Sequence, residues 1–175
     1  MSMFQRNPAL LTLLALSFAA VHLAFEHFTG GVKGHHALNR PDLPVVSNWL
    51  GLLTLPLLGF ALWLRIRSQV SQEYWAGFPR SVLAALVGGS LYGIVLSVAF
   101  ELNATAVMNA AAVGFLVLAL AFPVYRAEYI TGFVVGMTFT FGGVLPLLVA
   151  LVVAAISFAG RYIVRSAVSL VRRRR

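Results

Sequence analysis

Apolar stretches long enough to cross a lipid bilayer follow one another along almost the whole chain, and this feature restricts its fold more than any other. A transmembrane helix needs about 20 predominantly apolar residues. Sixty per cent of the 175 residues are hydrophobic, only 10% are charged, and the mean hydropathy is +0.89. A soluble domain of this length could not bury so much apolar surface. The sequence therefore predicts an all-α integral membrane protein with a single domain over residues 1–175.

Six transmembrane helices account best for the apolar stretches. The predicted spans cover about residues 8–29, 45–64, 80–102, 104–122, 124–141 and 147–164. The apolar stretch from Tyr129 to Ile156 is too long for one untilted crossing, and Gly142, Gly143 and Pro146 favour a chain reversal within it. A single kinked helix in that stretch would give five spans instead. The short connections predict a compact antiparallel bundle.

Basic residues are distributed unevenly between the two ends of the predicted spans. With six spans, Lys33 and Arg40 lie on one side and all the other basic residues lie on the opposite side. Cytoplasmic loops are enriched in Lys and Arg, so both termini are predicted to be cytoplasmic. Five spans would remove most of this asymmetry. The loop over residues 30–44 is then extracytoplasmic, the interfacial loop over residues 65–79 is cytoplasmic, and residues 165–175 form a basic cytoplasmic tail.

The net charge of +8 and the isoelectric point near 11.1 are compatible with two kinds of anionic partner. Because the arginines flank apolar stretches, the sequence favours anionic lipid at the cytoplasmic face of a cell membrane over nucleic acid. A second membrane protein or a further copy of the chain is another possible partner. The chain has no cysteine, which excludes disulfides, thiolate catalysis and Cys-ligated metal centres.

Polar side chains of the predicted spans gather in the outer halves, whereas the inner halves are almost purely aliphatic. His22 and Glu26 are four residues apart and so share one face of the first helix. Ionisable residues within spans usually mark a substrate or ion site, although Glu26 and Glu101 are also close enough to the interface to reach headgroup water. The predicted binding pocket comprises His22, Glu26, Asn48, Ser97, Glu101 and Asn109.

Small residues recur every four positions in two of the predicted spans. Gly89 and Gly93 form one such pair and Gly132 and Gly136 form another, and this spacing typically lets two helices approach closely. We expect the first pair to bring the third helix against the first, so that Glu26 and Glu101 lie near each other. The pattern has no relation to a phosphate-binding loop.

Imidazole and carboxylate groups on the predicted outer side could together ligate a divalent ion such as Zn²⁺. The candidate metal ligands are His22, Glu26, His27, His35, His36, Asp42 and Glu101. Their spacing matches no standard zinc motif, and the adjacent His35 and His36 are equally compatible with an exposed loop that binds nothing. No catalytic residue can be named from the sequence.

Six short helices in 175 residues resemble, in size and architecture, the vitamin-binding substrate components of energy-coupling-factor transporters. The His and carboxylate residues also resemble those of ceramidase-type membrane hydrolases, but the His-x-x-x-His pair of that family is missing. Neither resemblance assigns a residue. Three hypotheses follow: a solute- or ion-binding transport subunit, a metal-dependent hydrolase acting on lipid at the outer leaflet, and a structural subunit of a larger complex.

Overall fold

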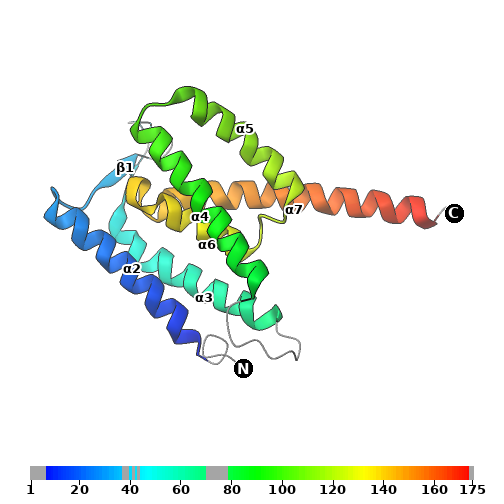
Figure 1. Cartoon of the computed structure of the whole chain (residues 1–175), viewed down its shortest axis with the longest axis horizontal. Helices are drawn as coiled ribbons and strands as arrows, with labels where there is room; N and C mark the ends of the chain where they lie inside the picture. The colour runs from blue at the N-terminus through cyan, green and yellow to red at the C-terminus, as the bar shows by residue number, and fades with distance from the viewer. Residues whose placement is uncertain (1–6, 37–39, 41, 43, 70–78, 174–175) are drawn as a thin grey trace.

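The computed structural model describes residues 7–36, 40, 42, 44–69 and 79–173. These residues form six α-helices and one antiparallel pair of short strands (Figure 1). The elements in chain order are α2 (Pro8–Phe28), β1 (Gly34–His36), β2 (Val45–Ser47), the 3₁₀ helix η2 (Asn48–Leu50), α3 (Gly51–Gln69), α4 (Arg80–Glu101), α5 (Thr105–Ala121), α6 (Ala127–Phe141) and α7 (Val144–Arg173).

Four helical segments are long and apolar enough to cross a membrane. They are Pro8–Phe28, Asn48–Ser68, Arg80–Glu101 and Val144–Ser166. The helix α5 is apolar but shorter, with 17 residues, and α6 has 15. Large apolar side chains point away from the protein along these helices, as in a surface that lipid covers. The predicted all-helical fold is confirmed, with the small sheet as an addition.

Glycines allow α4 and α6 to pack backbone against backbone. A β-carbon on Gly132 would lie 2.2 Å from the carbonyl oxygen of Leu86 in α4. β-carbons on Gly136, Gly93 and Gly89 would lie 2.3, 2.6 and 2.8 Å from backbone oxygens of the facing helix. The expected close approach is therefore present, but the partner is wrong: Gly89 and Gly93 face α6 and not the first helix α2.

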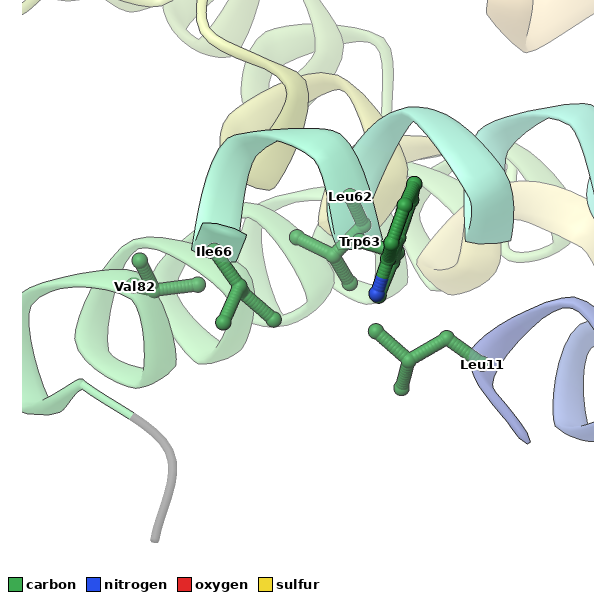
Figure 2. Packing of buried hydrophobic residues seen from close by; sticks show 5 residues of the cluster. All are labelled: Leu11, Leu62, Trp63, Ile66 and Val82. Atoms are coloured by element: carbon green, nitrogen blue, oxygen red, sulfur yellow. The ribbon is translucent and has the colours of Figure 1, made fainter. Parts of the chain in front are cut away.

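The helix α2 packs on α3 instead. Gly59 of α3 makes this possible, because a β-carbon there would lie 2.6 Å from the carbonyl oxygen of Leu11. Next to this contact is a buried apolar cluster to which α2, α3 and α4 all contribute, and in Figure 2 three of its side chains descend from α3 between the other two helices. The cluster consists of Leu11, Leu62, Trp63, Ile66 and Val82.

Successive helices run in alternating directions (Figure 1). The C-terminal end of α2, the two strands, the start of α3 and the turn between α6 and α7 consequently lie at the same end of the molecule. The long helix α7 then extends past the other helices toward the C-terminus. This alternation gathers residues that are far apart in the sequence into the candidate site described below.

The boundaries of several helices agree with the sequence prediction, but the second predicted span is wrong at both ends. Residues 45–47 form β2, which pairs with β1, and α3 continues to Gln69. The start of the predicted cytoplasmic loop over residues 65–79 is therefore helical, and its residues 70–78 lie outside the described part. The predicted basic tail over residues 165–175 belongs to α7 as far as Arg173.

The predicted break near Gly142 is confirmed. The helix α6 ends at Phe141, and α7 begins at Val144. Gly142 has a φ of +69°, which residues with a side chain rarely adopt, and its amide donates to the Thr138 carbonyl. Pro146 lies in the first turn of α7, where a missing backbone N–H costs no helical hydrogen bond.

Candidate functional site

The carboxyl group of Glu26, near the C-terminal end of α2, is the centre of the candidate site. Only 3% of this residue is exposed. Its Oε1 atom accepts a hydrogen bond of 2.6 Å from the Asn48 side-chain amide, and its Oε2 atom accepts one of 3.3 Å from the backbone amide of Lys33. A carboxyl group in an apolar bundle needs such donors to offset the loss of water. Glu26 therefore connects α2 to the strand region and to η2.

The two short strands position these donors. His35 of β1 pairs with Val46 of β2, and the backbone amide of Asn48 donates to the Lys33 carbonyl. The loop after α2 folds back because Gly30 and Gly31 both have positive φ, and the amide of Gly31 donates to the Glu26 carbonyl. The strand pair thus lies across the end of α2, with the Glu26 carboxyl group beneath it.

Asn48 is itself held by the turn between α6 and α7. A β-carbon on Gly142 would lie 2.0 Å from the Asn48 side-chain oxygen, so this amide occupies the space that any other residue would fill. Asn48 is 4% exposed. Gly142 is therefore required both by its backbone conformation and by the close approach of Asn48.

Two buried imidazole nitrogens lack a hydrogen-bond partner among the described residues. One is Nε2 of His22, which lies 3.7 Å from Oε1 of Glu26. The other is Nε2 of His35. Phe139 packs edge-to-face on His22 with ring centroids 5.1 Å apart, and Phe141 lies 6.1 Å from the His35 ring. An aromatic wall from the end of α6 therefore lines the site.

The charges around His35 come from three different segments. Burial lowers the pKa of the His35 imidazole below its ordinary value. The carboxylates of Glu26 and Glu101 act in the opposite direction, whereas the Lys33 ammonium reinforces the lowering. Burial dominates, so His35 favours its neutral form. His35 is thus near enough to both carboxylates for each to influence its charge.

The structure brings three of the six residues of the predicted binding pocket together. His22, Glu26 and Asn48 lie together. Glu101 is exposed at the end of α4, and the described residues place no hydrogen bond or ion pair between it and Glu26. Ser97 is buried, but its hydroxyl donates to the Gly136 carbonyl within the contact between α4 and α6. Asn109 is exposed on α5.

The candidate metal ligands do not form a metal centre. In the part of the chain that the structure describes, no group of three or more His, Asp and Glu side chains is arranged to hold a metal ion. His27 is exposed and packs on the Phe28 ring, with ring centroids 5.4 Å apart. Asp42 forms an exposed bidentate pair with Arg40. His36 is exposed in β1. The geometry gives no support to the zinc site or to a metal-dependent hydrolase.

Sequence reasoning missed a second buried carboxylate at the opposite end of the bundle. Glu128 is 2% exposed, and both of its carboxylate oxygens lie 3.2 Å from Nε of Arg65. Glu128 belongs to the first turn of α6, a position that also suits the dipole of that helix, and Arg65 lies near the C-terminal end of α3. The sequence signal that could have revealed this pair is the placement of Arg65 and Glu128, which have opposite charges, at the same predicted depth near the cytoplasmic side.

None of the family models, curated proteins or solved structures with which the chain was compared matches it. The chemistry of the site is therefore inferred from the side chains and backbone groups that form it. It combines a buried carboxyl group that accepts hydrogen bonds from two N–H donors with two buried imidazole nitrogens that have no hydrogen-bond partner among the described residues. Such a set can exchange protons or hold a small polar molecule.

Proposed function

We propose that this protein is a multi-pass membrane protein with six crossings that binds a small polar solute or a proton at Glu26 and acts as a binding or transport subunit. The observation that carries the proposal is the pair of buried nitrogens on His22 and His35 that have no hydrogen bond among the described residues, beside a buried carboxyl group. Leaving a buried polar atom unpaired costs about 1–3 kcal/mol, and native proteins contain few such atoms. A bound solute or water that forms hydrogen bonds with these nitrogens would remove that cost.

The distribution of charge supports both termini being cytoplasmic in a cell membrane, with the site facing outward. Arg65 and Arg67 lie near the C-terminal end of α3, whereas Asn48 begins the 3₁₀ helix η2 that precedes α3. Arg126 precedes α6, whose opposite end meets Asn48. The basic end of each of these helices is therefore the end away from Glu26, as positive-inside orientation requires.

The alternative of a structural subunit that uses its glycines as partner surfaces receives less support. The small-residue faces of α4 and α6 are occupied by each other within the chain. A divalent ion is also disfavoured, because three suitable ligands are not brought together among the described residues. A proton or a small organic solute needs no such ligand set.

The proposal is tested by thermal unfolding of the detergent-solubilised protein in the presence of amino acids, polyamines and monovalent cations. A ligand stabilises only the state that binds it. We expect at least one compound to raise the unfolding temperature of the wild type and not of Glu26→Gln or His22→Ala. Asp42→Asn is the matched control, because it makes the same carboxyl-to-amide change at an exposed position.

Proton binding is measured in parallel by infrared spectroscopy, which detects a carboxyl group that changes protonation with pH. We expect a carboxyl signal that Glu26→Gln removes and Asp42→Asn retains. If no compound distinguishes the variants and Glu26→Gln leaves the spectra unchanged, the site is structural and the proposed function is wrong.

A further inference from the structure

An apolar cavity of about 370 Å³ lies between α4, α5, α6 and α7, toward the other end of the bundle from Glu26. Three aromatic rings form one wall of the cavity. The ring centroids of Tyr92 and Phe115 are 5.2 Å apart, and those of Phe115 and Phe133 are 4.9 Å apart. Gly88 and other small residues of α4 leave the space next to these rings open. The volume is within the range of natural ligand sites, about 300–1,000 Å³.

The helix α5 covers this cavity without filling it. Of its 17 residues, all of which the structure describes, Ala119 is the buried one. Polar contacts hold the helix instead: the Tyr92 hydroxyl donates to the Ala111 carbonyl, and Ser157 of α7 donates to the Phe122 carbonyl at 3.1 Å. Contacts near its middle and its C-terminal end therefore keep α5 in place while the space beneath it stays open.

Three arginines lie near residues at the end of the cavity that Ser81 and Val124 line, although none of the three is part of the lining. The exposed Arg80 precedes Ser81, and the exposed Arg126 is two residues beyond Val124. Arg161 donates from Nη2 to the Ala121 carbonyl at 2.7 Å. Its Nε atom is buried and has no hydrogen-bond partner among the described residues. An acceptor for this N–H must therefore enter between α5 and α7, next to the Ala121 carbonyl.

We propose that the cavity holds one acyl chain of an anionic phospholipid, with the phosphate bound by Arg161 together with Arg80 and Arg126. An apolar lining suits a hydrocarbon chain, and a guanidinium with a spare donor suits a phosphate. The arrangement matches an amphiphile of the inner leaflet, where anionic lipids are common. This inference rests on the proposed placement of the helices in a bilayer, but not on the solute site at Glu26.

Native mass spectrometry of the full-length protein in detergent tests the proposal, with phosphatidylglycerol and phosphatidylcholine that carry identical dioleoyl chains. We expect the first phosphatidylglycerol molecule to bind at least about fivefold more tightly than phosphatidylcholine, because no choline ammonium offsets its phosphate charge and one basic residue near an anionic lipid contributes about 1 kcal/mol. Arg161→Gln should reduce this preference by about the same factor. Equal binding of the two lipids by the wild type would overturn the proposal.

The cavity itself is tested by Gly88→Leu. A β-carbon on Gly88 meets no atom within 4 Å, so the larger side chain can occupy the cavity without displacing the backbone. We expect first-lipid binding to weaken by about tenfold or more. Val87→Leu, at an exposed neighbouring position, should leave it unchanged, as should Asp42→Asn at an exposed carboxylate. Wild-type lipid affinity in Gly88→Leu would contradict the proposal.

Tryptophan fluorescence in vesicles provides a second measurement that does not depend on purification with bound lipid. In a variant whose three native tryptophans are replaced by phenylalanine, Phe115→Trp reports on the cavity and Leu116→Trp on the outer face of α5. Phosphatidylglycerol brominated on its chains should quench both reporters. Adding Gly88→Leu should protect position 115 and not position 116, and unchanged quenching at 115 would overturn the proposal.

Discussion

A single amide connects three parts of the molecule at the residue scale, since Asn48 donates to Glu26 and fills the space beside Gly142. We predict that Asn48→Ala lowers the free energy of unfolding by about 1–3 kcal/mol, because it removes a donor from a buried carboxyl group. Asn109→Ala, at an exposed position of α5, should change stability little. Denaturant unfolding in detergent measures both, and equal stabilities would show that Glu26 does not depend on Asn48.

The lowered pKa of His35 leads to a second prediction at the residue scale, which concerns the pH dependence of stability. Its pKa in the folded protein is lowered by burial from the ordinary value of 6.5, so the folded state binds fewer protons than the unfolded chain just below that value. Stability from neutral His35 is therefore complete above about pH 6.5 and is lost as the pH falls toward the lowered folded value. We expect thermal unfolding temperatures to decrease over this range.

The variant His35→Gln should reduce that decrease, whereas His27→Gln should not, because His27 is exposed. Thermal unfolding of the three proteins at several pH values compares them. A pH dependence that is identical in the wild type and His35→Gln would show that another group is responsible.

Local spacing predicted part of the site and long-range packing produced the rest. His22 and Glu26 could be placed together because a helix brings residues four apart onto one face. The backbone donor from Lys33 could not be foreseen, since it depends on the pairing of β1 with β2. The Arg65–Glu128 pair also depends on how α3 and α6 pack, which no local pattern specifies.

At the scale of whole elements, the contact between α4 and α6 depends on the absence of side chains. We predict that Gly132→Ala destabilises the protein by about 1–3 kcal/mol, because its methyl group would lie 2.2 Å from the Leu86 carbonyl oxygen and must push the helices apart. Gly88→Ala is the control: the added carbon meets no atom within 4 Å, and alanine favours the helix by about 1 kcal/mol.

Both variants are compared with the wild type by thermal unfolding in the same detergent. Two equally stable variants would show that the backbones of α4 and α6 are farther apart than described.

Apolar length and terminal charges were sufficient to predict most of these helices. The strand pair was missed because Val45 and Val46 extend the apolar stretch of α3, and only their partners in β1 reveal a strand.

Orientation belongs to the scale of the whole molecule, and the absence of cysteine makes it easy to measure. We predict that a thiol reagent unable to cross membranes labels Arg40→Cys from outside intact cells. Ser68→Cys, near the end of α3, should react only after the membrane is opened. Both positions are exposed in the structure, so a difference reports on sidedness. The opposite labelling pattern would invert the proposed topology.

The pairing of α4 with α6 also determines an order of events while the chain is being made. These two helices are separated in the sequence by α5, so α4 leaves the ribosome before its glycine-bearing partner exists. At a synthesis rate of roughly 5–20 residues per second, α6 is completed some seconds after α4, and the glycine face of α4 has no partner helix during this delay. A lipid or insertion factor that contacts this face during that interval would have to leave before α4 and α6 can pack backbone against backbone.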